Sequence, residues 1–358
     1  MSIIQAAHAF QLEGAPIQCE EFGHGHINYT YKITTDAGFE YILQRINTYV
    51  FRQPVQLMAN ASAVTDFIRE RVDDPRLSLH FIPTSEGLFY HQDNDGCFWR
   101  MYDFVGGFCL DAPESDEDFY QSALAFGRFQ HLLSDFPADT LFETIPEFHN
   151  TIDRYRLLKG SVAADPIGRL AGVQGDVDFL LEREEKGSIL QKMRESGELP
   201  LRVTHNDTKL NNVLLDRKTR ASLCVLDLDT VMPGLSVHDF GDSIRFGAAT
   251  AAEDEPDTSK MKLDLHLFEV YTQGYLEAAT ALTDKEVEML PLGAYTMTLE
   301  VAVRFLKDYL DGDLYFKTAY PDHNLIRARS QMALLRDMEA KWNEMNRIVA
   351  DTAKKVRG

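Results

Sequence analysis

Residues 201–247 decide the fold of this chain, and they read LRVTHNDTKLNNVLLDRKTRASLCVLDLDTVMPGLSVHDFGDSIRFG. Two short apolar segments, residues 213–215 and 223–228, are separated by a polar turn and are predicted to pair as a hairpin. Neighbouring strands lie about 5 Å apart, so Asn212 and Asp227 are expected side by side. Amide and carboxylate oxygens, with no Cys or His at metal spacing, suit Mg²⁺ rather than Zn²⁺.

The polar residues of this stretch follow a recognisable spacing. In the kinase catalytic loop, H-x-D is followed after four residues by Asn and, on a later strand, by a metal-binding Asp. His205, Asp207, Asn212 and Asp227 occupy these places in the same order. In that scheme Asp207 accepts the proton of the substrate hydroxyl, and Asn212 and Asp227 hold the metal on ATP. Lys209 is expected to neutralise charge on the transferring phosphoryl group.

The departures from the protein-kinase pattern identify a narrower group. Leu-Asp-Thr follows Asp227 in place of Phe-Gly, which makes Asp229 a further candidate metal ligand, and the chain contains no Ala-Pro-Glu. The chain therefore resembles the aminoglycoside phosphotransferase-like family of small-molecule kinases over almost its whole length. The phrases RVTHNDTKLNN, DLDTVMPG and DFGDSIRFG are most similar to those of bacterial hexosamine kinases in this family.

This resemblance implies a kinase-like α+β fold with two lobes. Residues 1–105 are expected to form a small lobe with an antiparallel sheet and one helix, and residues 106–358 a larger, mostly helical lobe. The reaction implied is transfer of the γ-phosphoryl group of ATP, with Mg²⁺, to O1 of N-acetylglucosamine or N-acetylgalactosamine. In such kinases an Asp at the start of the helix after the catalytic stretch, Asp239 here, hydrogen-bonds the catalytic loop.

The period of the hydrophobic residues supports this layout. Alternating apolar residues predict strands from residue 29 and over 41–46, and a DNDG turn at 93–96 predicts a hairpin. A short helix is expected at 2–12 and a longer one at 54–72. The remaining predicted helices are 115–133, 146–160, 165–172, 174–196, 236–246, 263–279, 283–311 and 323–353.

The nucleotide is expected to contact the first lobe. Gly23, Gly25 and Asn28 form a G-x-G-x-x-N turn whose backbone amides can cover phosphates, although such a turn alone also fits a plain hairpin. The second strand of the hairpin predicted around residues 93–96 is followed by the expected hinge, the segment that contacts adenine. This hinge includes Asp103 and Val105.

The usual phosphate-binding Lys of the third strand is missing. Gln44 or Arg45 occupies its place, and strand parity allows only one of them to face ATP. The helix at 54–72 offers no Glu on its first turns, because its acids are Asp66 and Glu70. The Lys–Glu pair of kinases is therefore predicted to be absent.

Three residues are candidates for the acceptor site. His26 lies in the Gly turn, Arg304 lies on an apolar helical face where a charge needs a partner, and Tyr315 follows Gly312-Asp313. For Arg304 the alternative is an internal salt bridge. Asp207 completes the expected acceptor site at the reacting hydroxyl.

The composition and charge of the chain limit the kinds of partner that it is expected to bind. The chain has 358 residues and a net charge of −20, which disfavours nucleic acid or a membrane surface as a partner. The four cysteines are scattered, the first residues lack the features of a signal peptide, and no apolar run approaches the roughly 18 residues of a membrane span. We expect a cytoplasmic protein with no obligate protein partner.

Two alternatives remain open at this point. The first is a kinase of the same fold that acts on another small alcohol, such as an aminoglycoside, choline or homoserine. The second is a catalytically inactive binding protein, which the absent Lys–Glu pair would favour and the joint presence of Asp207, Asn212 and Asp227 disfavours.

Overall fold

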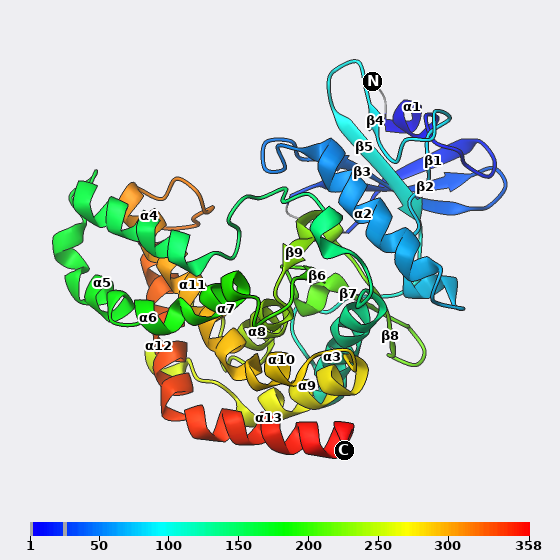
Figure 1. The fold of residues 1–358 in the computed structure, drawn as a ribbon. Helices are drawn as coiled ribbons and strands as arrows, with labels where there is room; N and C mark the ends of the chain where they lie inside the picture. Colours follow the sequence, from blue (N-terminus) through cyan, green and yellow to red (C-terminus); the bar gives the residue numbers. More distant parts are fainter. Residues whose placement is uncertain (1–2, 24–26) are drawn as a thin grey trace. The chain divides into compact units, whose positions relative to one another are not determined.

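The computed structural model describes residues 3–23 and 27–358 and divides into two compact units. Unit 1 comprises residues 1–109, 132–146 and 212–233, and unit 2 comprises the rest of the chain. Unit 1 contains α1 (Ile3–Ala7), β1 (Pro16–Glu21), β2 (Tyr29–Thr35), β3 (Glu40–Ile46), α2 (Pro54–Arg69), β4 (His91–Gln92), β5 (Phe98–Asp103), β7 (Val213–Leu215) and β8 (Ser222–Val225), with β9 (Met232–Gly234) at its end (Figure 1).

The five-stranded sheet of unit 1 has the order β1-β2-β3-β5-β4, and its paired strands are antiparallel. The short helix α1 covers one face, where its Ala6 and Ala7 share a buried apolar core with Leu43 of β3 and Met101 of β5. Successive residues of a strand point to opposite faces. Gln44, which pairs with Arg100 across the β3–β5 register, therefore lies with Arg100 on the other face.

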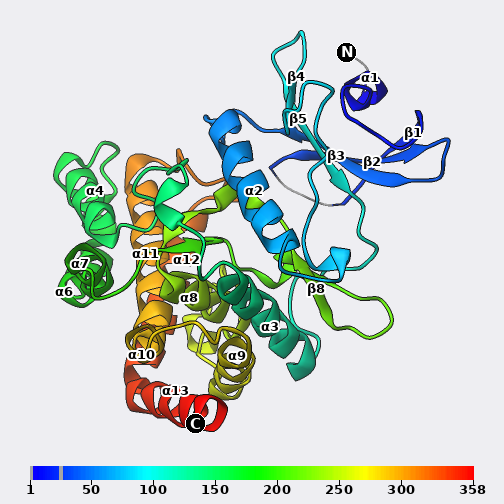
Figure 2. The same ribbon diagram turned by 45° about the vertical axis from the view of Figure 1, so that its right-hand side comes forward.

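Helix α2 lies alongside this other face of the sheet (Figures 1 and 2). The sulfur of its Met58 is 3.9 Å from a guanidinium nitrogen of Arg100. Its Asn60 donates to the carbonyl oxygens of Phe142 at 2.8 Å and Val231 at 2.9 Å. A buried amide with both donors used in this way fixes α2 to the segment that follows the β7–β8 hairpin, which lies between the candidate metal ligands Asn212 and Asp227.

The predicted hairpin is present as β7 and β8, with Val213 opposite Val225. The amide of Leu226 donates to the carbonyl of Asn212 at 2.8 Å, so Asp227 is one residue beyond the partner of Asn212. The second strand is shorter than predicted. It ends before Asp227, whose φ of 53° is left-handed and opens a 3₁₀ turn over Leu228–Thr230. The left-handed backbone turns the chain out of the sheet at a candidate metal ligand.

Unit 2 is built mainly from helices. It contains α3 (Asp116–Leu132), α4 (Thr151–Ala164), α5 (Gln174–Leu181), α6 (Glu184–Gly187), α7 (Ile189–Ser196), β6 (Arg202–Thr204), α8 (Ser236–Gly247), α9 (Leu265–Ala278), α10 (Asp284–Glu288), α11 (Leu290–Asp311), α12 (His323–Ala340) and α13 (Trp342–Arg357). The long helix α11 packs against α4, α8 and α12.

Two glycines set the contact between α8 and α11. A Cβ on Gly241 of α8 would lie 2.3 Å from the carbonyl oxygen of Gly293 on α11, and a Cβ on Gly293 would lie 2.1 Å from that of Val237. The two backbones therefore touch at a distance that side chains would prevent. This close contact places α8, which carries Asp239 and Asp242, firmly on the buried helix α11.

Several predicted helices are interrupted. The segment predicted as one helix at 174–196 forms α5, α6 and α7, and Ser188 between the last two bonds its hydroxyl to the Glu184 carbonyl at 2.7 Å. Such back-bonding competes with continuous helix. The prediction for 165–172 is wrong apart from a 3₁₀ turn at Leu170–Gly172, because Asp165 and Gly168 both have positive φ.

Other helix boundaries moved for local reasons. The 146–160 helix begins at Thr151, where the Asn150 side chain accepts from the amide of Asp153. The 283–311 segment is two helices, the second of which begins at Leu290 with Pro291 in its first turn, and the 323–353 segment breaks at Lys341. The first helix covers only Ile3–Ala7 of the predicted 2–12. Thr283 and Glu286 form a capping box at the start of α10.

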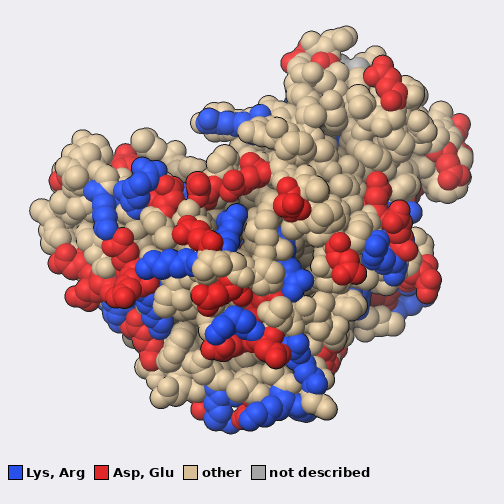
Figure 3. Space-filling view, in the orientation of Figure 1, with Lys and Arg blue, Asp and Glu red and all other residues tan. Residues whose placement is uncertain are grey.

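The surface carries both signs of charge despite the net charge of −20. On the face shown in Figure 3, Lys and Arg side chains are interspersed with Asp and Glu side chains. Within residues 3–23 and 27–358, none of the helices combines the length and the apolar character that a bilayer crossing requires.

Candidate active site

The catalytic loop of unit 2 is held by one carboxylate. Asp239 of α8 accepts from the backbone amides of His205 at 2.9 Å and Asn206 at 2.8 Å, and Gln130 donates to it at 3.0 Å. The residue is almost fully buried, and this burial raises the pKa of Asp239 above its ordinary value even though the amides of His205 and Asn206 oppose the shift. The predicted hydrogen bond from the loop to Asp239 is confirmed.

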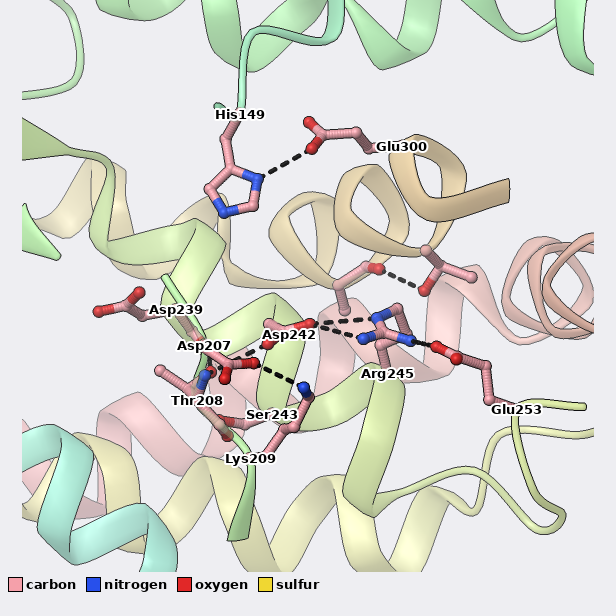
Figure 4. A network of polar contacts seen from close by, with 12 residues as sticks. His149, Asp207, Thr208, Lys209, Asp239, Asp242, Ser243, Arg245, Glu253 and Glu300 are labelled. Carbon is pink, nitrogen blue, oxygen red and sulfur yellow. Dashed lines mark hydrogen bonds and ion pairs between the residues drawn. The ribbon is translucent and has the colours of Figure 1, made fainter. Parts of the chain in front are cut away.

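A second set of bonds ties the loop to α8. The Thr208 hydroxyl donates to the Asp239 carbonyl at 2.6 Å, its amide donates to Asp242 at 3.2 Å, and Ser243 donates to its carbonyl at 2.8 Å. Asp242 also pairs with Arg245, three residues later on the same helix, at 2.9 Å. The loop is therefore fixed on both sides of Asp207 (Figure 4).

Asp207 and Lys209 form the ion pair of the loop, with 2.9 Å between carboxylate and ammonium. Both side chains keep about a third of their surface exposed, at 30% and 35%. Burial alone would lower the pKa of Lys209, but the carboxylates of Asp207 and Asp242 outweigh it and raise that pKa. Lys209 therefore stays charged at neutral pH, which the predicted role in phosphoryl transfer requires.

His205 has a structural place in this loop. Its ring is fully buried, lies edge-on to Phe126 and Phe129, and accepts from the Asp207 amide at 3.2 Å. The ring thus supports the backbone of Asp207 from inside the helical unit.

The metal candidates of unit 1 are oxygen donors on the β7–β8 hairpin. Asn212 and Asp227 supply one amide and one carboxylate, and Mg²⁺ is commonly held by one or two carboxylates together with water and substrate phosphates. In the part of the chain that the structure describes, no group of three or more His, Cys, Asp or Glu side chains is arranged to hold a metal alone. The donor set therefore fits an ion that arrives with a phosphate, and the ligand roles stay predictions.

Asp229, the third metal candidate, is engaged by two other side chains. Its Oδ1 pairs with the guanidinium of Arg100, and its Oδ2 accepts from Asn28 at 2.6 Å. Arg100 also donates through Nε to Gln44 at 2.9 Å. Sequence reasoning missed Arg100, which is 2% exposed, because strand β5 reads as an ordinary core strand. A charged residue between Trp99 and Met101 was the only available signal.

The nucleotide candidates have the following partners. Gly23 has a left-handed φ of 75°, and a Cβ there would meet no atom of the described residues within 4 Å; Gly25 and His26 lie outside the described residues. Asn28 bonds Asp229 and accepts from the Asn47 amide at 2.9 Å, so its side chain shapes the turn. Of the two candidates on β3, Gln44 lies with Arg100, whereas Arg45 stacks on the Tyr29 ring at 4.2 Å.

The predicted hinge follows strand β5. The side chain of Asp103 pairs with His80 at 2.8 Å, and the backbone amide of Phe104 donates to the Glu40 carbonyl at 3.1 Å. Val105 is partly exposed one residue later. Adenine recognition by Asp103 and Val105 remains a prediction.

Arg304 of α11, the main acceptor candidate, lies among aromatic rings. Its guanidinium carbon is 5.4 Å from the ring centres of Phe148 and Phe316 and 5.9 Å from that of Tyr315, which is 70% exposed. Among the described residues no Asp or Glu oxygen lies within the 4.0 Å of an ion pair with Arg304. The alternative of an internal salt bridge is therefore not what the structure shows.

A buried polar cluster on the same helix was not predicted. Glu300 is fully buried and pairs with His149 at 2.9 Å, and Thr151 donates to it at 3.3 Å. Burial alone would raise its pKa, but His149, Arg154 and Arg304 outweigh this effect and lower the pKa of Glu300 to about 2. The surroundings of Glu300 thus stabilise its charged form.

His238 of α8 lies next to this cluster, with its ring 5.5 Å from that of His149. Burial, reinforced by His149, lowers the pKa of His238 to about 3. The side chain is therefore neutral at physiological pH.

A sheet with one helix, a helical unit, and a H-x-D loop followed by Asn and Asp together define a kinase-like phosphotransferase. The model of the phosphotransferase enzyme family known as APH matches residues 18–276. The chain belongs to this family. The predicted kinase-like α+β fold and the predicted family are confirmed.

Solved structures with the same fold come from several small-molecule kinases. The amicoumacin kinase hAmiN, solved with AMP-PNP, Ca²⁺ and its ligand, is 13% identical over 95% of this chain and 92% of its own, with a TM-score of 0.60. An aminoglycoside phosphotransferase from Alicyclobacillus acidocaldarius is 15% identical over 100% and 97%, with 0.58. Choline kinase from Cryptosporidium parvum is 12% identical over 96% of both chains, with 0.59. At these identities the likeness establishes the fold alone.

Proposed function

We propose that the enzyme is an N-acetylhexosamine 1-kinase, which transfers the γ-phosphoryl group of ATP to O1 of N-acetylglucosamine or N-acetylgalactosamine. The observation that supports this acceptor is the environment of Arg304. Its guanidinium is held by rings of Phe148, Tyr315 and Phe316 and has no ion-pair partner among the described residues. Its donors are therefore available to the hydroxyl and acyl oxygens of a neutral sugar.

In this proposal each residue of the catalytic loop has one task. Asp207 accepts the proton from the sugar O1 hydroxyl, or orients that hydroxyl for in-line attack. Lys209, held at 2.9 Å from Asp207, stabilises charge on the transferring phosphoryl oxygens. Asp239 keeps the backbone around Asp207 in position through the amides of His205 and Asn206.

The nucleotide side of the proposal uses the first lobe, residues 1–105, and the β7–β8 hairpin. Asn212 and Asp227 would hold Mg²⁺, which would neutralise negative charge on the phosphates of ATP. The backbone of Gly23 would face the phosphates, and the segment from Asp103 to Val105 would face adenine. The sugar-binding lobe, residues 106–358, would supply Arg304 and Tyr315.

A kinase for a cationic acceptor, such as an aminoglycoside or choline, is the main alternative. Such a substrate favours an acidic pocket, as opposite charges stabilise each other. Glu300, a buried carboxylate four residues before Arg304 on α11, is already paired with His149, and Arg154 and Arg304 stabilise its charged form. This excess of cations around one acid supports a neutral acceptor.

An acceptor panel with ATP and Mg²⁺, analysed by phosphorus NMR, tests the proposal. N-acetylglucosamine and N-acetylgalactosamine should give a 1-phosphate, while choline, homoserine and kanamycin should give no product. The Asp207→Asn variant should lower turnover by about 10²- to 10⁴-fold. A 6-phosphate, or product only with a cationic acceptor, would overturn the assignment, and neutral-sugar turnover in Asp207→Asn above a tenth of wild type would remove Asp207 from its role.

A further inference from the structure

We propose that Arg100 is a positioning residue that replaces the missing Lys–Glu pair and fixes Asp229 beside the metal-binding turn. Asp229 then acts as the partner of Arg100 and not as a direct metal ligand. The inference rests on the proposed function, because it concerns how the enzyme holds Mg²⁺ and ATP.

The network of Arg100 joins segments that are far apart in the sequence. Its Nε donates to Gln44 of β3 at 2.9 Å, and its terminal nitrogen pairs with Asp229, two residues after Asp227. Asn28, at the start of β2, donates to the other oxygen of Asp229 at 2.6 Å. One guanidinium therefore connects two sheet strands, and through Asp229 the Gly-turn end of β2, to the chain that follows the metal-candidate hairpin.

Burial makes this connection strong and its loss costly. The side chains of Arg100 and Asp229 are 3% and 2% exposed. Removing one partner of a buried ion pair leaves the other charge uncompensated, whereas replacing both with apolar residues of similar volume is often neutral. The Arg fork also suits this place better than Lys, since it serves two acceptors in a fixed plane.

The geometry also indicates different roles for Asp229 and Asp227. Both oxygens of Asp229 already accept hydrogen bonds from Arg100 and Asn28. Asp227 lies at the left-handed turn that begins the 3₁₀ segment containing Asp229. Fixing Asp229 thus fixes the backbone of Asp227, and residues that orient a metal ligand affect metal affinity by about 10–100-fold.

The test is a cycle of variants in the full-length chain. Binding of ATP is measured by calorimetry with Mg²⁺ and with EDTA, together with the melting temperature. The single variants Arg100→Met and Asp229→Leu should each weaken ATP binding in Mg²⁺ by about 10-fold or more, with a smaller effect in EDTA. The double variant Arg100→Met/Asp229→Leu should recover part of both the melting temperature and the Mg²⁺-dependent affinity.

The other outcomes are decisive. If Asp229 were a direct metal ligand, the double variant would bind Mg²⁺-ATP no better than Asp229→Leu, and the inference would be wrong. Arg100→Lys, which keeps the charge, should lie between wild type and Arg100→Met, and an equal loss in both would also contradict it. Arg156→Met, which removes an exposed Arg paired with Asp153 on α4, is the control and should bind ATP as wild type does.

The inference and the proposed function fail in different ways. Wild-type protein that does not bind ATP in the presence of Mg²⁺ would contradict the proposed function itself. Wild-type protein that binds ATP, with Arg100→Met within about threefold of it in Mg²⁺, would contradict only the role of Arg100.

Discussion

The substitution Asp239→Asn tests whether the geometry of the catalytic loop depends on one buried carboxylate. One oxygen of Asp239 accepts from the His205 amide at 2.9 Å and from Gln130 at 3.0 Å, and the other accepts from the Asn206 amide at 2.8 Å. An Asn side chain has only one acceptor oxygen. In either orientation its NH₂ group must face a backbone N–H group that can no longer find a partner.

The expected magnitude follows from that count. A buried donor left without an acceptor costs about 1–3 kcal/mol. Asp239→Asn should therefore lower the free energy of unfolding by roughly 2 kcal/mol, or the melting temperature by about 4–8 °C for a unit of this size. The displaced loop carries Asp207, and a misplacement of about 1 Å can cost roughly 10²-fold in rate, so kcat should fall by about that factor.

Thermal unfolding and steady-state kinetics on the same preparation measure both effects. Glu253→Gln is a matched control, because it changes another carboxylate to an amide at the more exposed end of the Asp242–Arg245–Glu253 chain. That control should retain nearly full kcat. An Asp239→Asn enzyme with a lower melting temperature but kcat within threefold of wild type would show that the position of Asp207 does not depend on Asp239.

The remaining predictions concern metal, acceptor and pH. Asp227→Ala should abolish Mg²⁺-dependent turnover and weaken Mg²⁺-ATP binding, and unchanged Mg²⁺ dependence would refute its ligand role. Arg304→Ala should raise the sugar KM by about 10- to 100-fold, since a charged hydrogen bond contributes about 1.5–3 kcal/mol, with the KM for ATP unchanged. Because burial lowers the pKa of His238 from 6.5 to about 3, the unfolded chain binds an extra proton in this window and stability falls with decreasing pH. Urea titrations should show that His238→Gln removes about 2 kcal/mol of the wild-type loss between pH 6.5 and 5.

Local patterns were sufficient to predict the elements that bear the site. The alternation in β2 and β3 and the β7–β8 hairpin depend on neighbours in the sequence, and both are present. The spacing from His205 to Asp227 similarly identified the loop that Asp239 holds. These features could be predicted because each is determined by residues that lie close together in the sequence.

Features that depend on distant contacts could not be predicted in this way. The choice between Gln44 and Arg45 required the register of β3 on β5, which places Gln44 beside Arg100. Arg100 and Asp229 are 129 residues apart in the sequence, and no local pattern connects them. The breaks at Ser188 and Lys341 were missed because a helix pattern continues through both.

The absence of a Lys on β3 favoured an inactive binding protein in the sequence analysis. The structure weakens this reason, because it contains other cations. Arg100 supplies a buried cation on the adjacent strand, and Lys209 supplies a partly exposed cation in the catalytic loop. Each of these two cations forms an ion pair with a carboxylate, so positive charge is present at both places although the chain as a whole has a net charge of −20. Arg304 differs from both, since aromatic rings lie around it and no carboxylate of the described residues forms an ion pair with it. A cation that is paired in the resting enzyme can organise a site, whereas one without a carboxylate partner is suited to bind a substrate, and for this reason Arg304 is the residue on which the acceptor assignment depends.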